Sequence, residues 1–246
     1  MDLELKDKGI LVVGASGDIG RATVSRFLDE GARVFVAGRT ASRLSAAFEG
    51  RVAGSTTIDL RDDASIEHAV EEARMVLGEI DVLVCAAAGD NPFGTVWEAE
   101  RKKFEEDFAL KCIGNAQLCR HVARQMVARG SGAIVIVIGI NTDMLVLTNP
   151  VGSATNSGLR AFTRVLAGEV APSGIRVVGL SPGMTMGERL GRFAGDALEQ
   201  IRQSIPLRRI GQPQEMADVI AFLASPRASY MAGTIVTVDG GLTLVR

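Results

Sequence analysis

Three glycines near the amino terminus stand where a chain can bind a phosphate group. The segment ILVVGASGDIGRAT places Gly14, Gly17 and Gly20 between an apolar, β-branched run and an amphipathic stretch. Glycines at a strand-to-helix turn let the backbone approach a diphosphate, whose charge then meets the helix N-terminus. The spacing predicts a dinucleotide-binding turn, and a plain tight turn between a strand and a helix is the alternative.

A guanidinium follows the second apolar run, where the adenosine ribose of a dinucleotide would lie. The usual acceptor at this place, about 20 residues beyond the glycines, is a carboxylate that binds two ribose hydroxyls. Here VFVAGRT ends in Arg39 and Thr40, with Arg43 close behind. Because a guanidinium pairs with a 2′-phosphate, Arg39 favours NADP(H) over NAD(H). A solvated surface arginine is the alternative.

Short β-branched runs alternate with helical stretches along the whole chain. Continuous apolar runs are typical of strands in a parallel sheet that is covered on both faces. The pattern predicts an α/β fold, a Rossmann-like doubly wound seven-stranded parallel sheet flanked by helices, as a single domain over residues 1–246. Strands are expected at 9–14, 33–38, 55–60, 81–87, 132–139, 174–180 and 233–240, and helices at 20–31, 62–77, 98–129, 158–170 and 214–223. Residues 149–157 are expected to form a loop that runs into the helix after it.

Composition excludes several classes of function. The net charge of −2 offers no electrostatic case for nucleic acid or an anionic membrane. The cysteines Cys85, Cys112 and Cys119 have no CxxC spacing and only two histidines to join them, so we expect buried free thiols, with neither metal nor disulfides. No signal-peptide core and no membrane span are visible, which favours a soluble protein of the cytoplasm.

Four segments resemble the short-chain dehydrogenase/reductase family. GASGDIG (14–20) is similar to its glycine loop, with Asp18 in place of a glycine, and DVLVCAAAG (81–89) to its fourth strand. GIRVVGLSPG (174–183) and the long segment 206–241 resemble its sixth strand and its C-terminal region. The resemblance, with the turn and Arg39, implies a cofactor site formed by Gly14, Ser16, Gly17, Asp18, Ile19, Gly20, Arg39, Thr40, Asp59, Leu60, Ala86, Ala87, Ala88, Asn156, Pro182, Gly183 and Thr185.

The same resemblance implies an unusual catalytic site. Members of the family use Asn, Ser, Tyr and Lys: the tyrosine exchanges the proton, the lysine tunes it and holds the nicotinamide ribose, the serine binds the substrate oxygen, and the asparagine anchors a water relay. The helix SGLRAFTRVLAGE (157–169) sets the register of these positions. They fall on Lys111, Gly139, Gly152 and Asn156.

A census of residue types rules out a simple shift of register. The only tyrosine is Tyr230, in the C-terminal SYMAG turn, and no lysine follows Lys111. Ser153 and Thr142 lie near the serine position and are alternative hydroxyls. The sequence therefore predicts a divergent member that lacks the usual tetrad.

Few other residues can carry acid–base chemistry. Lys111 is the main candidate, as an acid or an anion-binding cation, and the alternative is that it fills a vacant water site or turns to solvent. His68 and His121 are expected on helix surfaces. Asp90 and Asn91 are expected at the mouth of the cleft, where AAAGDNPFG is similar to the dienoyl-CoA reductase branch. Apolar residues in the cleft segments favour a partly hydrophobic ligand: Phe93, Trp97, Met144, Leu145, Met184 and Met186.

Two functions remain open from the sequence. One is an NADP(H)-binding oxidoreductase that acts on a small, partly apolar substrate without the usual tyrosine and lysine. The other is a non-catalytic cofactor-binding protein, either a sensor or an inactive subunit of an oligomer. The resemblance also implies a homotetramer or a homodimer.

Overall fold

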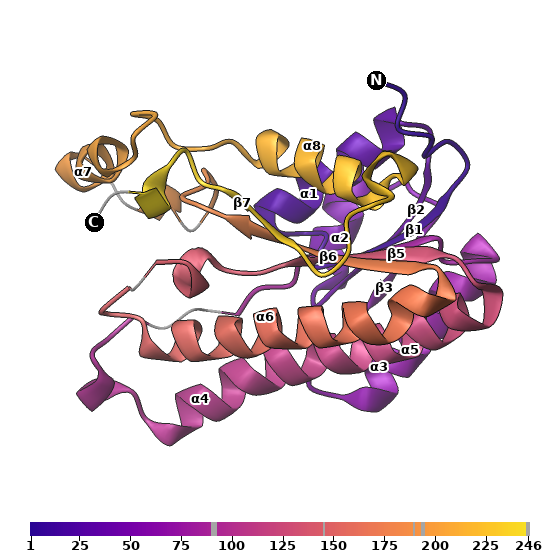
Figure 1. The fold of residues 1–246 in the computed structure, drawn as a ribbon, viewed down its shortest axis with the longest axis horizontal. Coiled ribbons are helices and arrows are strands. Elements are labelled where there is room, and N and C mark those ends of the chain that lie inside the picture. Colours follow the sequence, from indigo (N-terminus) through magenta and orange to yellow (C-terminus); the bar gives the residue numbers. More distant parts are fainter. Residues whose placement is uncertain (90–92, 145, 189, 193–194, 245–246) are drawn as a thin grey trace.

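A seven-stranded parallel sheet forms the centre of the molecule (Figure 1). The computed structural model describes residues 1–89, 93–144, 146–188, 190–192 and 195–244. The strand order is β3-β2-β1-β4-β5-β6-β7, and every neighbouring pair is parallel. The strands are β1 (Gly9–Val13), β2 (Arg33–Gly38), β3 (Gly54–Thr57), β4 (Val82–Cys85), β5 (Gly132–Val137), β6 (Ile175–Pro182) and β7 (Ile235–Val238). The predicted fold class is confirmed.

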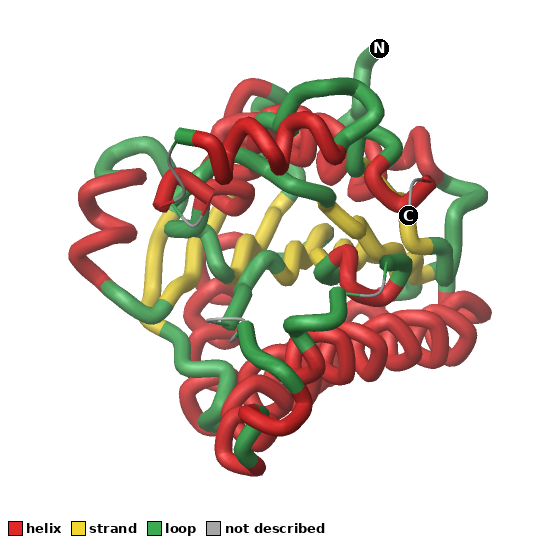
Figure 2. Tube along the Cα trace, turned by 90° about the vertical axis from the view of Figure 1, so that its left-hand side faces the viewer, coloured by secondary structure: helices red, strands yellow, loops and turns green. Residues whose placement is uncertain are grey.

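Helices cover both faces of the sheet, as Figures 1 and 2 show. One face packs against α1 (Asp18–Asp29), α2 (Ala41–Phe48) and α8 (Pro213–Ala224). The other packs against α3 (Asp63–Leu77), α5 (Gly114–Arg129) and α6 (Pro150–Val170). All residues of β1 and β4 are buried, because apolar cores lie on both sides of these central strands. Helices α4 (Arg101–Asp107) and α7 (Asp196–Ser204) complete the set of described α-helices.

The helix that was expected to begin at residue 158 begins eight residues earlier, so the predicted loop over 149–157 is wrong. Helix α6 starts at Pro150, whose fixed φ suits the first turn of a helix. The side chain of Asn149 caps it by accepting a hydrogen bond from the Gly152 amide at 2.9 Å. The small residues of this stretch are therefore helical, and Gly152 and Asn156 lie on its first two turns.

The helix expected over 98–129 is interrupted by a π-helical segment. Between α4 and α5, residues Phe108–Ile113 form a π-helix, so the three segments run on as one long rod (Figure 1). A π-helix widens the turn and is frequent at functional sites. Lys111 lies within this segment. Helix α2 was not predicted, because its short amphipathic pattern carries a weak signal.

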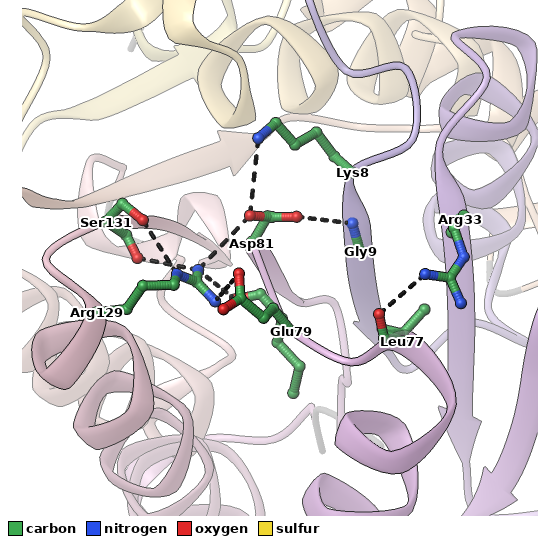
Figure 3. Close-up of polar contacts among 9 residues, drawn as sticks. Lys8, Gly9, Arg33, Leu77, Glu79, Asp81, Arg129 and Ser131 are labelled. Atoms are coloured by element: carbon green, nitrogen blue, oxygen red, sulfur yellow. Dashed lines mark hydrogen bonds and ion pairs between the residues drawn. The ribbon is translucent and has the colours of Figure 1, made fainter.

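A polar cluster holds the amino ends of the central strands (Figure 3). The carboxylate of Asp81 accepts a hydrogen bond from the Gly9 amide at 2.9 Å and pairs with Lys8 and Arg129. Arg129 also pairs with Glu79 at 3.2 Å. The cluster ties β1 to the turn before β4 and to the end of α5. It stabilises the edge of the sheet opposite the glycine turn.

Candidate active site

The carboxyl ends of the strands bring the predicted site residues to one edge. In a parallel sheet all strands end on the same side, and ligands bind where the strand order reverses. Here the order reverses between β1 and β4, so the crevice expected for a ligand lies beside Gly14 and Ala86–Gly89. Arg39 follows β2 and Gly139 follows β5 at the same edge. Gly183 follows β6 there as well.

The glycine turn has the backbone geometry that close approach requires. Gly14 has φ +82°, and a Cβ there would overlap the Ala87 amide nitrogen and lie 2.6 Å from its Cα. A Cβ at Gly20 would overlap the Gly14 carbonyl and lie 2.9 Å from the Ala15 Cα. At Gly17 the nearest atom to such a Cβ is 3.5 Å away. The turn therefore needs glycine at 14 and 20, whereas position 17 is not constrained by protein contacts.

Arg39 lies at the place expected for the ribose and exposes its guanidinium to solvent. Arg39 is exposed, and no ion pair is formed by it among the residues that the structure describes. Asp59, expected beside the adenine, is instead held by Arg61 through bonds of 2.9 and 2.8 Å. The hydrogen bond from Arg61 holds the pKa of Asp59 below its usual range. Ser16 lines the turn on the β2 side, with its Oγ 3.5 Å from where a Cβ at Gly38 would stand.

Asp18 brings a carboxylate to the first turn of α1. One oxygen accepts a hydrogen bond from the Glu188 amide at 2.8 Å, and the other pairs with Arg21 at 3.2 Å. A Cβ at Gly187 would overlap this carboxylate, so the segment after β6 passes directly against the phosphate turn. Thr185 lies on the same segment, where its Oγ1 donates to the Gly183 carbonyl at 3.1 Å.

Lys111 forms a buried ion pair at the heart of the site. Its Nζ lies 2.9 Å from an oxygen of Asp107, and the two side chains are only 7% and 4% exposed. The hydroxyl of Thr155, on α6, donates to the same carboxylate oxygen at 2.5 Å. A Cβ at Gly89 would lie 3.1 Å from the Lys111 Cε, so the pair lies against the segment that follows β4. Lys111 therefore does not turn to solvent.

Asp107 and Thr155 are site residues that sequence reasoning missed. Asp107 stands four residues before Lys111, the spacing at which opposite charges meet on a helix, and this signal is visible in EDFALK. Thr155 has no such signal, because it lies 48 residues from its partner along the chain. Together the three residues join the π-helix to the second turn of α6.

Gly139 lies directly against the side chain of Asn156. A Cβ at Gly139 would overlap the Nδ2 of Asn156 and lie 3.0 Å from its Cγ. Asn156 is buried at 5% exposure, and its neighbour Thr155 belongs to the Lys111 cluster. The four positions at which the tetrad was expected, including Gly152 on the first turn of α6, are thus brought to one place by the fold.

A second polar cluster fixes the segment that follows Gly139. Asp143 pairs with Arg160 of α6 and accepts a hydrogen bond from Ser181 of β6 at 3.2 Å. Thr142 accepts from Arg160 at 3.1 Å, so it is engaged in this cluster and does not stand in for a serine at Gly139. These contacts tie the loop after β5 to α6 and β6. Sequence reasoning missed Asp143 and Arg160 as well.

The remaining acid–base candidates lie away from this edge. Tyr230 is fully exposed and precedes β7, so it lies at the amino edge of the sheet. His68 pairs with Glu72 at 3.6 Å on the outside of α3. His121 lies partly buried on α5. Asp90, Asn91 and Leu145 lie outside the described residues.

The three cysteines are free thiols; Cys85 and Cys119 are buried as expected, whereas Cys112 is only partly buried. The sulfur atoms of Cys85 and Cys119 are 3.9 Å apart in the core. The hydrogen bond between them and their burial hold the pKa of the Cys85 thiol well above its usual range. Cys85 is therefore protonated and unreactive near neutral pH.

Apolar side chains gather beside the site on the C-terminal side. Met144, Met184 and Met186 pack against a cluster of Ile140, Leu190, Ile205, Ile210 and Leu242. Phe93 and Trp97, also expected in the cleft, are 64% and 93% exposed. The described part of the chain contains no helix that is both long and apolar enough to span a membrane.

Comparisons with known proteins agree with this geometry. Residues 14–243 match the family model described as enoyl-(acyl carrier protein) reductase. The chain is 33% identical to a glucose 1-dehydrogenase of Gluconobacter oxydans (strain 621H), covering 96% of this chain and 92% of the relative. It is 32% identical to a cis-4-hydroxycyclohexanecarboxylate dehydrogenase of Sinomonas cyclohexanicum, covering 96% of each.

Solved structures show the same fold over the full chain. A short-chain dehydrogenase/reductase family protein superimposes with a TM-score of 0.90 at 33% identity, covering 98% of this chain and 100% of that one. L-Sorbose reductase of Gluconobacter frateurii, solved with NADPH and L-sorbose, superimposes with a TM-score of 0.92 at 28% identity over 100% of both chains. This chain belongs to the short-chain dehydrogenase/reductase family, whose relatives here are oxidoreductases.

The buried ion pair predicts a specific pattern of stability. Replacing Lys111 by Met or Asp107 by Leu should each cost about 3–5 kcal/mol, because each removes one member of a buried ion pair. The double variant should lose less than either single variant. Urea unfolding measures all three. Glu105→Ala, which removes an exposed pair with Arg101 on the same helix, is the control and should change stability by less than about 0.5 kcal/mol. Equal effects of Asp107→Leu and Glu105→Ala would contradict the prediction.

The contact between Gly139 and Asn156 predicts a coupling between these positions. Gly139→Ser should destabilise the protein by about 1–3 kcal/mol, because the new side chain overpacks against the Asn156 amide. Asn156→Ala should remove most of that cost when combined with Gly139→Ser. A double-mutant cycle measured by thermal unfolding reports the coupling, and additive effects would show that the two side chains do not meet.

Proposed function

We propose that this chain is an NADP(H)-dependent oxidoreductase acting on a small, partly apolar carbonyl or alcohol, by a route that does not use a tyrosine and a lysine. The observation that carries the proposal is the position of Arg39. It stands exposed at the end of β2, beside the switch point of the sheet and next to the glycine turn. A guanidinium at that place suits a 2′-phosphate better than two ribose hydroxyls.

The residues of the crevice fit most of this cofactor. Gly14 and Gly20 give the turn its close backbone approach, and Arg39 gives the ribose end its cation. Asn156 is shorter than the lysine expected for the family and gives the nicotinamide ribose a weaker partner. The first turn of α1 does not fit a diphosphate as it stands, because the carboxylate of Asp18 already lies there.

Bound NADP(H) would supply or accept the hydride. The proton must come from elsewhere, and Tyr230 is excluded by its place at the opposite edge of the sheet. Gly139 and Gly152 bring no side chain, and Asn156 and Thr155 are neutral. We assign the proton to water, and to Lys111 a positioning role, since its ammonium group is held by Asp107.

The relatives support a hydroxyl or keto substrate. Their names include a glucose dehydrogenase, a hydroxycyclohexanecarboxylate dehydrogenase and an L-sorbose reductase. The methionines that line the C-terminal side of the site favour a substrate with an apolar part. We further propose a cytoplasmic homodimer or homotetramer, which the exposed Ile113 of the π-helix, Val127 of α5 and Val165 of α6 support.

Arg39 should decide between the two dinucleotides. Arg39→Gln should weaken NADPH binding roughly 10–100-fold and leave NADH binding nearly unchanged, because only NADPH loses charged hydrogen bonds. Calorimetric titration of each dinucleotide measures this. Arg164→Gln, which removes an exposed arginine from the far half of α6, is the matched control. Equal losses for both dinucleotides would show that Arg39 does not read the 2′-phosphate. If neither dinucleotide binds below about millimolar concentration, the proposed function is wrong.

The assignment of the tetrad positions predicts a gain of function. The variant Gly139→Ser/Gly152→Tyr/Asn156→Lys should reduce simple ketones with NADPH at least about 100-fold faster than the wild type, since a positioned general acid contributes that much. All three changes are made together because catalytic groups that act as a unit have strongly non-additive effects. Gly152→Phe in place of Gly152→Tyr lacks only the phenol and is the control. A folded triple variant no faster than this control would show that the positions are misassigned.

A further inference from the structure

The first turn of α1 is occupied by a contact within the chain itself. Asp18 is the first residue of α1, and its carboxylate accepts the Glu188 amide at 2.8 Å. These residues are 170 positions apart, so the contact is made by the fold and not by the local turn. The close approach depends on Gly187, since a Cβ there would overlap the Asp18 carboxylate and lie 2.9 Å from its Cβ.

The side chain of Glu188 adds a second tie to the same place. It pairs with Arg43 of α2 at 2.6 Å and with Arg192 at 3.8 Å. Arg43, a cation at the mouth of the crevice, is thereby neutralised from within the chain. Glu188 thus contacts both helices, α1 through Asp18 and α2 through Arg43. The ion-paired side chains are about half exposed, with Arg43 at 53% and Glu188 at 58%, so the tie is weak enough to open.

A dinucleotide needs this same place for its diphosphate. The diphosphate is bound by the free amide groups and the positive end of the helix that follows the glycine turn. A carboxylate at the helix N-terminus is stabilised by the same helix dipole that would stabilise a phosphate. Its negative charge also repels a phosphate that approaches the same place. Asp18 stands where the glycine loop that this segment resembles commonly has a glycine, so the repulsion comes from this one side chain.

We propose that Asp18 acts as an internal substitute for the diphosphate and that its contact with Glu188 and dinucleotide binding exclude each other. In the closed form the carboxylate holds residues 187–188 across the phosphate turn. In the open form Asp18 releases the Glu188 amide and the diphosphate takes its place. The inference rests on the proposed function, because it concerns the affinity of the same crevice for NADP(H).

Charge and size at position 18 can be tested separately. Asp18→Asn keeps the size and an acceptor oxygen but removes the charge, and Asp18→Gly removes both. Each should raise the affinity for NADPH at least about tenfold, and the gain of Asp18→Asn should shrink at high salt. Asp29→Asn removes an exposed carboxylate from the other end of α1 and should bind NADPH as the wild type does. Calorimetric titration measures the affinities.

Hydrogen exchange provides a reading that needs no dinucleotide. In the protein alone, the Glu188 amide should exchange faster in Asp18→Gly than in the wild type or in Asp29→Asn, because it loses its acceptor. The wild type should show the same acceleration when NADPH is added. No acceleration in Asp18→Gly would overturn the inference, and Asp18→Asn guards against a failure of the glycine variant to fold.

The outcomes separate this inference from the proposed function. If the wild type binds NADPH and the Asp18 variants bind it no more tightly, the inference is overturned and the proposed function stands. If only the Asp18 variants bind, the inference is supported, and NADP(H) is not the wild-type ligand. If no form of the protein binds NADPH, both are overturned.

Discussion

Parallel pairing of the strands is the constraint on which the rest of this structure depends. Because all seven strands point the same way, every loop that follows a strand opens at one edge, and residues far apart in sequence meet there. Burial on both faces makes the central strands uniformly apolar, so they carry no polar side chains of their own. All chemistry is consequently left to the strand ends and to the helices that start beside them.

At that edge the chain holds a buried charge pair. Lys111 and Asp107 are both buried. A buried ion pair is tolerated only when both charges are present and their other hydrogen-bonding groups are satisfied. Thr155 supplies one of those bonds from α6. The π-helix widens the rod locally at Lys111, and such segments are common where helices carry function.

The phosphate turn shows two opposing tendencies. Gly14 and Gly20 preserve the backbone approach of a dinucleotide-binding loop, whereas Asp18 introduces a negative charge at the same helix end. A helix N-terminus stabilises either a carboxylate or a phosphate, but the two repel each other when both are present. Asp18 and Glu188 therefore meet at the helix end where the proposed function would bind a diphosphate.

Much of the fold and part of the site followed from local sequence, and the physical reason is that both are short-range properties. Apolar runs and their alternation with helical segments determined the strands and the layers, and the census showed that Tyr230 is the only tyrosine and that no lysine follows Lys111. The start of α6 was not predicted, because Pro150 and Asn149 act as a cap only once the chain enters the helix there.

The tertiary structure alone decided three long-range contacts: Asp107 with Thr155, Asp143 with Ser181, and Asp18 with Glu188. These partners lie 38 to 170 residues apart, and only the packing of the helices on the sheet brings their side chains within bonding distance.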